Sequence, residues 1–168
     1  MKIKIFLLLF ITNLTMAQNT SVEAFLEKWN NSKVYLMEVA QAMPEDLYNY
    51  KPTEREMSFG EQLFHIKGNM EWLSSTYFTK NDYVKSKNDK HVSKAETIAL
   101  LEKSFDAVSE IIKKSDPKLL DVKVDFFAGP KTKLQILNLL QDHVTHHRGQ
   151  LLVYLNLNNI QPPAYVGW

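Results

Sequence analysis

Apolar residues recur at helical spacing in four separate stretches of the chain. Between residues 25 and 43 they stand three or four positions apart, and Pro44 follows directly. Further periodic stretches run over 59–78, 98–112 and 134–157. This spacing places apolar side chains on one face of a helix. The pattern predicts four helices, the last of which runs from Lys133 to about Asn158.

The four stretches share a start signal, a serine or threonine followed three residues later by glutamate or glutamine. In this capping box the hydroxyl and the acid or amide satisfy backbone N–H groups at the helix start. The boxes begin at Thr20, Ser58, Ser93 and Thr132. Alternating apolar and polar residues at 122–126 also predict a short extended segment before the last helix. We therefore expect an all-α fold, a four-helix bundle, whose order of up and down helices stays open.

The N-terminal residues 1–17 have the layout of a secretory signal peptide. Two lysines precede an apolar run from Ile5 to Ile11, and Thr15-Met16-Ala17 offers small residues at the −3 and −1 positions of a cleavage site. A membrane anchor is the alternative, but the run is shorter than the ~20 apolar residues that a bilayer span needs. We expect cleavage, a domain over 18–168 without a stable membrane anchor, and a periplasmic or secreted protein.

Composition narrows the chemistry that this chain can perform. The 168 residues include no cysteine, which excludes thiolate zinc sites, iron–sulfur clusters and a cysteine nucleophile. Twenty basic and 19 acidic residues give a net charge of +1, which offers no support for nucleic acid as a partner. The five glycines form no dinucleotide or phosphate-binding pattern. Any metal ion must therefore be held by nitrogen and oxygen ligands.

The five histidines are the candidate metal ligands. His143 and His147 stand one helical turn apart on an apolar stripe of the fourth helix, so both imidazoles can reach one ion. His146 falls on a different side of that helix, although ligation by the i, i+3 pair of His143 and His146 stays open. A pair of hydrogen-bonded core histidines is the other interpretation. His91 lies in a lysine-rich loop and is expected to be solvated.

His65 is the natural third ligand, because catalytic metal sites keep three protein ligands and one open position. It shares a polar stripe of the second helix with Gln62, Asn69 and Trp72. That stripe suits either a solvated surface or a wet cleft that faces the histidine pair, with Trp72 as an apolar wall. Valine follows His143, so the general base of the H-E-x-x-H zinc proteases is missing and that class is rejected.

Further residues near the histidines are candidates for supporting roles or for substrate contacts. Gln62 can orient a ligand imidazole, and Asp142 can support a ligand or form a surface pair. Arg148 can bind an anionic group, although a salt bridge at the bundle or dimer surface is the favoured interpretation. Gly149 is expected to permit close packing of helices.

Two segments of the chain resemble the DinB/YfiT-like metalloenzyme family. The first is Ser58–Ile66, followed by Trp72, and the second is His143–Leu151, which runs on to Leu157–Pro163. The resemblance covers nearly the whole mature chain and implies a four-helix bundle. It also implies that His65 and the pair His143 and His147 bind a divalent metal, with His146 as a neighbour. Family members are often homodimers, which implies a homodimer here.

The function that the resemblance implies is metal-dependent chemistry on a small substrate. The broader superfamily includes metal-dependent hydrolases, transferases that use small thiols, and maleylpyruvate isomerases. Small thiols are chiefly cytosolic, so the expected export favours hydrolysis or simple metal binding over thiol transfer. Three neutral imidazoles leave the ion its full charge, which can lower the pKa of a bound water to ~7.

We expect zinc, with nickel, iron or manganese as alternatives, because histidine ligands discriminate weakly among these ions. A metal-dependent hydrolase is the expected function. A metal-dependent transferase and a non-catalytic metal or small-molecule binder stay open.

Overall fold

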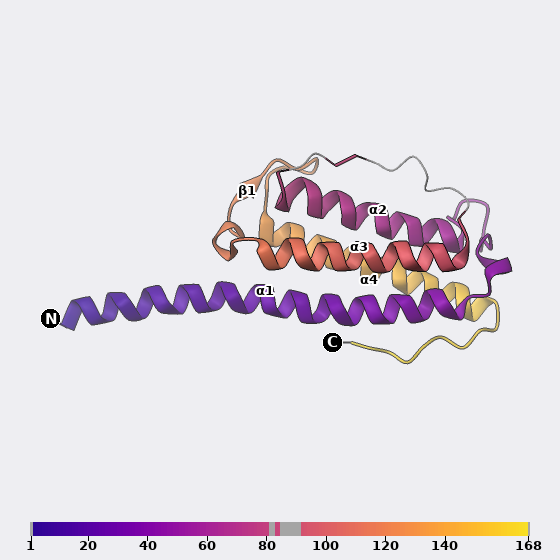
Figure 1. Cartoon of the computed structure of the whole chain (residues 1–168), viewed down its shortest axis with the longest axis horizontal. Coiled ribbons are helices and arrows are strands. Elements are labelled where there is room, and N and C mark those ends of the chain that lie inside the picture. The colour runs from indigo at the N-terminus through magenta and orange to yellow at the C-terminus, as the bar shows by residue number, and fades with distance from the viewer. Residues whose placement is uncertain (1, 81–82, 85–91, 168) are drawn as a thin grey trace.

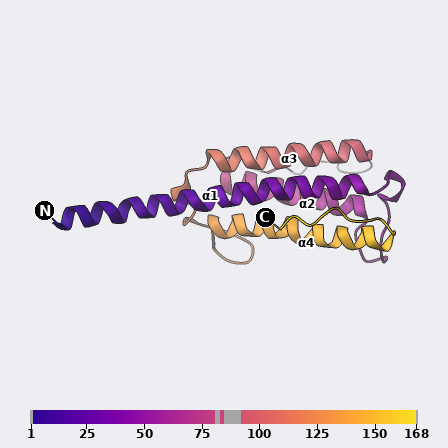
Figure 2. The same cartoon turned by 90° about the horizontal axis from the view of Figure 1, so that it is seen from below.

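The computed structural model of this chain describes residues 2–80, 83–84 and 92–167, with side chains described from Ser21 onward. The long helices α1 (Lys2–Ala42), α2 (Phe59–Phe78), α3 (Lys94–Lys114) and α4 (Lys133–Leu157) form a bundle (Figures 1 and 2). The connections contain the 3-10 helices η1 (Glu45–Leu47) and η2 (Pro117–Leu119) and the antiparallel strands β1 (Lys123–Val124) and β2 (Lys131–Thr132). The predicted all-α four-helix bundle is confirmed.

The order of the helices around the bundle is α1, α3, α2, α4, so each helix packs against two others. Helices α1 and α4 run in one direction, and α2 and α3 run in the opposite direction (Figure 1). The connection between α1 and α2 therefore joins two helices that lie diagonally across the bundle. As a result, α2 and α4 are adjacent and antiparallel, and these are the helices that carry His65 and the histidines of the fourth predicted helix.

Capping boxes explain where α2 and α4 begin. Ser58 Oγ accepts a hydrogen bond from the Glu61 backbone N–H at 3.2 Å, and a Glu61 carboxylate oxygen accepts one from the Ser58 N–H at 2.7 Å. Thr132 and Gln135 form the same reciprocal pair at the start of α4. Each pair satisfies two backbone donors that the first helical turn leaves without partners.

The prediction that a helix begins at Thr20 is wrong, because α1 is helical without a break from Lys2 to Ala42. The preceding turns offer carbonyl acceptors to the N–H groups of residues 20–23, so no side-chain cap is needed there. At α3 the confirmed part of the box is the bond from the Glu96 N–H to Ser93 Oγ at 3.2 Å.

Among the described helices, none combines the length and hydropathy that a membrane crossing requires.

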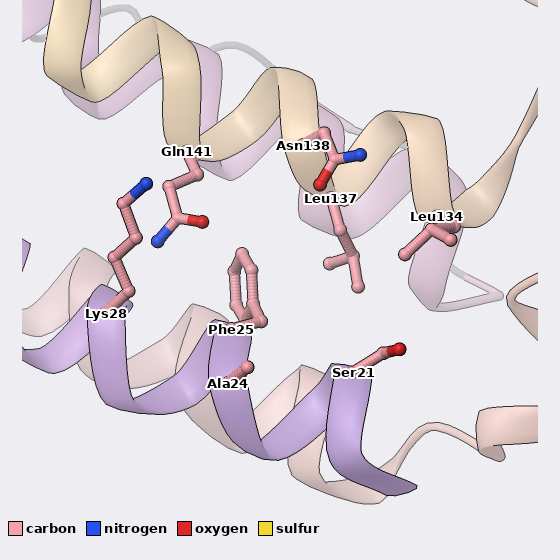
Figure 3. Close-up of a pocket in the computed structure, with 8 residues that line it drawn as sticks. All are labelled: Ser21, Ala24, Phe25, Lys28, Leu134, Leu137, Asn138 and Gln141. Carbon is pink, nitrogen blue, oxygen red and sulfur yellow. The ribbon is translucent and has the colours of Figure 1, made fainter. Parts of the chain in front are cut away.

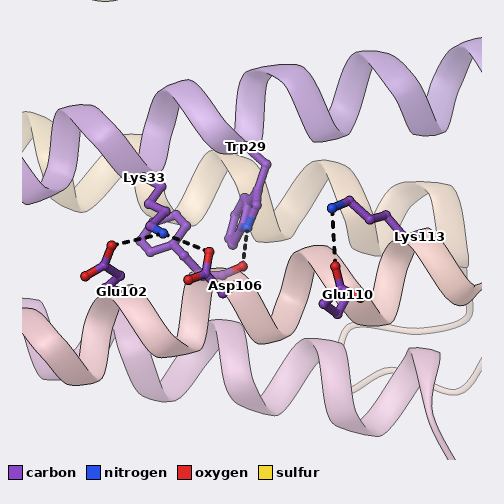
Figure 4. Close-up of polar contacts among 7 residues, drawn as sticks. Trp29, Lys33, Glu102, Asp106, Glu110 and Lys113 are labelled. Atoms are coloured by element: carbon purple, nitrogen blue, oxygen red, sulfur yellow. Dashed lines mark hydrogen bonds and ion pairs between the residues drawn. The ribbon is translucent and has the colours of Figure 1, made fainter.

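Polar contacts at the edge of the core join α1 to α3 (Figure 4). Trp29 is fully buried, and its indole N–H donates to the Phe105 carbonyl oxygen at 3.1 Å. Beside it, Lys33 forms ion pairs with Asp106 at 2.8 Å and with Glu102 at 3.2 Å. Burial takes the indole N–H away from water, and leaving it without an acceptor would cost free energy. The Trp29 N–H reaches the Phe105 carbonyl oxygen only when α1 and α3 are correctly aligned, so this contact helps to fix their register.

The Ser58→Ala substitution should lower the free energy of unfolding by about 0.5–2 kcal/mol, because it removes the side-chain acceptor of the α2 capping box. Urea unfolding followed by circular dichroism measures this change. Ser109→Ala, inside α3, is the matched control and should stay within about 0.5 kcal/mol of the wild type. Equal stability of the Ser58 variant and the wild type would contradict a capping role.

Candidate metal centre

Three histidines from two helices meet between α2 and α4. One ring nitrogen from each of His65, His143 and His147 lies within 4.8 Å of the other two. The Nε2 atoms of His65 and His143 are 3.1 Å apart, and the ring centroids of the three residues are 4.5–4.9 Å apart. His65 is exposed, His143 is half-buried and His147 is buried. Within the described residues, no other group of three such side chains lies so close together.

The rotation of α4 about its own axis sets this arrangement. Leu140, Val144 and Leu151 are each at most 1% exposed, so this face of α4 is fixed in the core. His143 and His147 flank these residues on consecutive turns and therefore point toward the antiparallel α2. The helical spacing of the histidine pair thus gives the observed geometry once the core has packed.

The spacing of the ring nitrogens fits one small divalent cation. Zinc–nitrogen distances of about 2.0–2.1 Å in a tetrahedral site place the ligand nitrogens roughly 3.3 Å apart. The separation of 3.1 Å between His65 Nε2 and His143 Nε2 is close to this value. Two neutral imidazoles facing each other so closely need either a shared proton or a cation between them. The histidine group therefore has the donor set and the spacing of a metal site.

A chain of hydrogen bonds orients His147. Its Nδ1–H donates to Gln62 Oε1 at 2.6 Å, and Gln62 Nε2 donates to the Tyr154 hydroxyl at 3.3 Å. The Tyr154 hydroxyl in turn donates to the Met57 carbonyl oxygen at 2.8 Å. Because Nδ1 carries the proton, Nε2 keeps the lone pair that a metal ion needs. Gln62 thus lies where it can orient the His147 imidazole, as predicted, and Tyr154, for which the sequence predicts no role, holds Gln62 in place.

His146 lies beside the three-histidine group and outside it. Its ring is exposed and meets the ring of His147 edge-on, with centroids 4.9 Å apart. Gln150 connects the two rings, since its Nε2 donates to His146 Nε2 and its Oε1 accepts from His147 Nδ1, both at 3.2 Å. His146 is therefore held next to the site while it remains in contact with solvent.

Burial and neighbouring imidazoles keep two of the histidines neutral. Desolvation, followed by the charges of His147, His65 and His146, lowers the pKa of His143 to about 3. Desolvation, followed by His65 and His146, lowers the pKa of His147 to about 4, and the bond to Gln150 opposes this shift. Both side chains are neutral at pH 7, and the neutral imidazole is the form that binds a metal.

The metal-free protein should lose stability as the pH falls from about 6.5 toward 4. Histidines in the unfolded chain keep a pKa near 6.5, whereas folded His143 and His147 resist protonation, with a pKa of about 3 and about 4 respectively. The unfolded state therefore binds more protons in this window, and the free energy of unfolding falls with the pH. Thermal unfolding in chelator across this range measures the slope. His143→Gln should make the slope shallower, and an unchanged slope would contradict the assignment.

Trp72 and Asp142 are not members of the three-histidine group. Trp72 stands two turns from His65 on α2, where it stacks with Phe126 and Phe127 of the loop between β1 and β2, with ring centroids 6.2 and 6.4 Å apart. Its role as an apolar wall of the site stays a prediction. Asp142 is exposed. His91 and the lysines expected around it lie outside the described residues.

Arg148 and Gly149 differ from their expected positions. Arg148 is 8% exposed, and its guanidinium stacks over the Tyr35 ring at 4.6 Å, inside the contact of α1 with α4 and away from the expected surface salt bridge. In the part of the chain that the structure describes, its Nη1 atom has no hydrogen-bond partner. Gly149 faces open space, since an added Cβ would meet no atom of the described residues within 4 Å, so the expected close packing at this glycine is wrong.

Comparisons with known proteins give the same fold and identify the family. The DinB family model matches residues 16–166, which include all three histidines of the site. The protein YjoA of Bacillus subtilis (strain 168) is 25% identical over 132 residues, which cover 76% of this chain and 85% of YjoA.

Two crystal structures resemble this chain closely in fold. The DinB-like YjoA from Bacillus subtilis has a TM-score of 0.71 and 20% identity and covers 84% of this chain and 96% of its own. A DinB-like protein from Bacillus cereus ATCC 10987 has a TM-score of 0.74 and 21% identity and covers 86% of this chain and 97% of its own. Because the family model covers nearly the whole bundle, the protein belongs to the DinB family.

Proposed function

We propose that this DinB-family protein binds one divalent metal ion through His65, His143 and His147 and uses it to hydrolyse a small substrate. The observation that carries the proposal is the meeting of three imidazole nitrogens within 4.8 Å of one another. A divalent ion with three neutral ligands supplies Lewis acidity and a nucleophile derived from water at neutral pH. Zinc suits an all-nitrogen set of this size, with nickel, iron and manganese as alternatives.

The side chains around the site have separate tasks in this proposal. Gln62, held by Tyr154, keeps the His147 proton on Nδ1 and so fixes which nitrogen faces the ion. His146 exchanges protons between the site and solvent, because it is exposed and Gln150 holds its ring next to His147. The exposed side of His65 is where a small substrate approaches.

Metal analysis and an activity screen test the proposed function together. Protein purified without added metal is analysed for bound elements and then offered small esters, amides and phosphate esters. We expect turnover that disappears with chelator and returns with zinc. His146→Gln should keep the metal and lower turnover. Turnover that requires an added thiol would instead indicate a transferase, and bound metal without turnover would indicate a non-catalytic binder.

We also propose that residues 1–17 are a signal peptide and that the mature, exported protein begins at Gln18. The apolar run and the small residues at 15 and 17 support this, and the family match begins only at residue 16. N-terminal sequencing of protein from the native host tests it, and an intact Met1 on cytoplasmic material would contradict it.

The homodimer implied by the family resemblance stays a prediction. Light scattering of the purified protein measures its oligomeric state.

A further inference from the structure

A second hollow lies between α1 and α4, away from the histidines (Figure 3). Its volume is about 400 Å³, which falls in the range of roughly 300–1,000 Å³ that is usual for small-molecule sites. Gln141 lines it from α4, and His143 and His147 lie about 200° and about 240° farther around that helix. The hollow and the metal centre therefore use different faces of α4.

One side of the hollow is apolar. The ring of Phe25 projects from α1 into the gap between the helices, and Leu134 and Leu137 face it from α4 (Figure 3). Phe25 is 6% exposed and Leu137 is fully buried, so both belong to the edge of the core. An apolar group of a ligand that packs here would move out of water onto apolar side chains, which is favourable.

The opposite side of the hollow offers a buried hydrogen-bond donor. Gln141 is 8% exposed, and its side chain extends from α4 toward α1 (Figure 3). Its Nε2 atom is buried and has no hydrogen-bond partner among the described residues. Buried donors are nearly always paired in folded proteins, because leaving one unpaired costs free energy. An acceptor atom of a ligand would satisfy this amide.

The charge of the hollow favours an anionic acceptor. Lys28 extends its amine from α1 toward the Gln141 amide (Figure 3). Of the described residues that line the hollow, Lys28 alone is charged, and Asn138 adds a further amide at the rim. A carboxylate accepts hydrogen bonds from both an ammonium and an amide, and such charge-assisted bonds are the stronger kind.

We propose that this hollow binds a small carboxylate with an apolar body. The carboxylate lies between Lys28 and Gln141, and the body lies against Phe25, Leu134 and Leu137. Binding does not require a metal ion, because the metal centre lies on another face of α4. Carboxylate binding at this hollow can therefore be tested independently of the proposed hydrolase function.

Octanoate is a suitable probe, because it combines a carboxylate with a short apolar chain. Isothermal titration of the full chain with octanoate should show saturable binding at one site. The affinity should be the same with and without chelator, and 1-octanol, which lacks the charge, should bind at least about tenfold more weakly. The methyl resonances of Leu134 and Leu137 should shift on titration. Absence of octanoate binding, equal binding of 1-octanol, or loss of binding in chelator would each overturn the proposal.

Two substitutions locate the carboxylate. Lys28→Met keeps the apolar stem and should weaken octanoate at least about tenfold, whereas Lys103→Met, an exposed lysine on α3, should not change it. Gln141→Leu should also weaken octanoate binding. It should not lower the melting temperature of the free protein, because it removes a donor for which the described part of the chain offers no acceptor. Unchanged octanoate affinity in either variant would overturn the assignment, and circular dichroism confirms that both variants fold.

Discussion

Alanine at any one of His65, His143 and His147 should lower the affinity for zinc by more than about hundredfold. Loss of an outer partner of a metal ligand usually costs about 10–100-fold, and loss of the ligand itself removes a full coordinate bond. Alanine at His146 should keep the affinity within about tenfold, because that ring lies outside the three-histidine group. Titration against a chelating indicator, together with metal analysis, measures both effects.

The same variants have a stability readout that does not depend on catalysis. Zinc should raise the melting temperature of the wild type, because it binds the folded state and joins α2 to α4. At a zinc concentration about 100 times the dissociation constant, the gain is about 2.7 kcal/mol. The three ligand variants should lose this gain, and His146→Ala should keep it.

Two outcomes would change the assignment. If His146→Ala empties the site while His147→Ala keeps it, the i, i+3 pair of His143 and His146 binds the metal. If all four variants bind zinc as the wild type does, the histidines are structural and the metal proposal fails.

Local signals were enough to predict where most of the helices begin. The bonds between Ser58 and Glu61, and between Thr132 and Gln135, join residues three positions apart, so the sequence already contains both partners. The box at Thr20 has the same pattern, yet in the full-length chain it is not a helix start, because the helical residues before it supply carbonyl acceptors. A capping box thus indicates a start only where the preceding chain is not helical.

The order of the helices could not be predicted, because it depends on contacts between distant residues. The bond from Trp29 to Phe105 joins residues 76 positions apart, and nothing in either local sequence marks the other as its partner. The histidine site likewise has one part that local sequence predicts and one part that depends on distant contacts. The pairing of His143 with His147 follows from helical spacing, whereas the approach of His65 requires α2 to pack antiparallel to α4.

The polar stripe of α2 shows why the sequence left two interpretations open. Gln62 and His65 share this stripe, yet Gln62 is 1% exposed and His65 is exposed. Periodicity assigns residues to a face and does not say how deep each one lies. Gln62 can be buried because Tyr154, 92 residues away, accepts its amide N–H and His147 satisfies its carbonyl oxygen.

Gln62→Leu should lower zinc affinity by about 10–100-fold without removing a ligand. The change takes away the nearer of the two acceptors for His147 Nδ1–H and leaves Gln150 Oε1 at 3.2 Å, so the proton and the ring are held less firmly. Gln62→Glu is the matched control. Its carboxylate can accept the same hydrogen bond from His147 Nδ1–H, so zinc affinity should stay within about tenfold of the wild type.

Tyr154→Phe separates orientation of the ring from simple packing. It keeps the aromatic ring and removes only the hydroxyl that accepts from Gln62 Nε2 at 3.3 Å, so it should weaken zinc less than Gln62→Leu does. The graded order of Gln62→Leu, Tyr154→Phe and wild type is what a chain of hydrogen bonds ending on His147 requires. If Gln62→Leu and Gln62→Glu weaken zinc equally, the acceptor at residue 62 does not hold the proton on Nδ1, and the glutamine only fills space between α2 and α4.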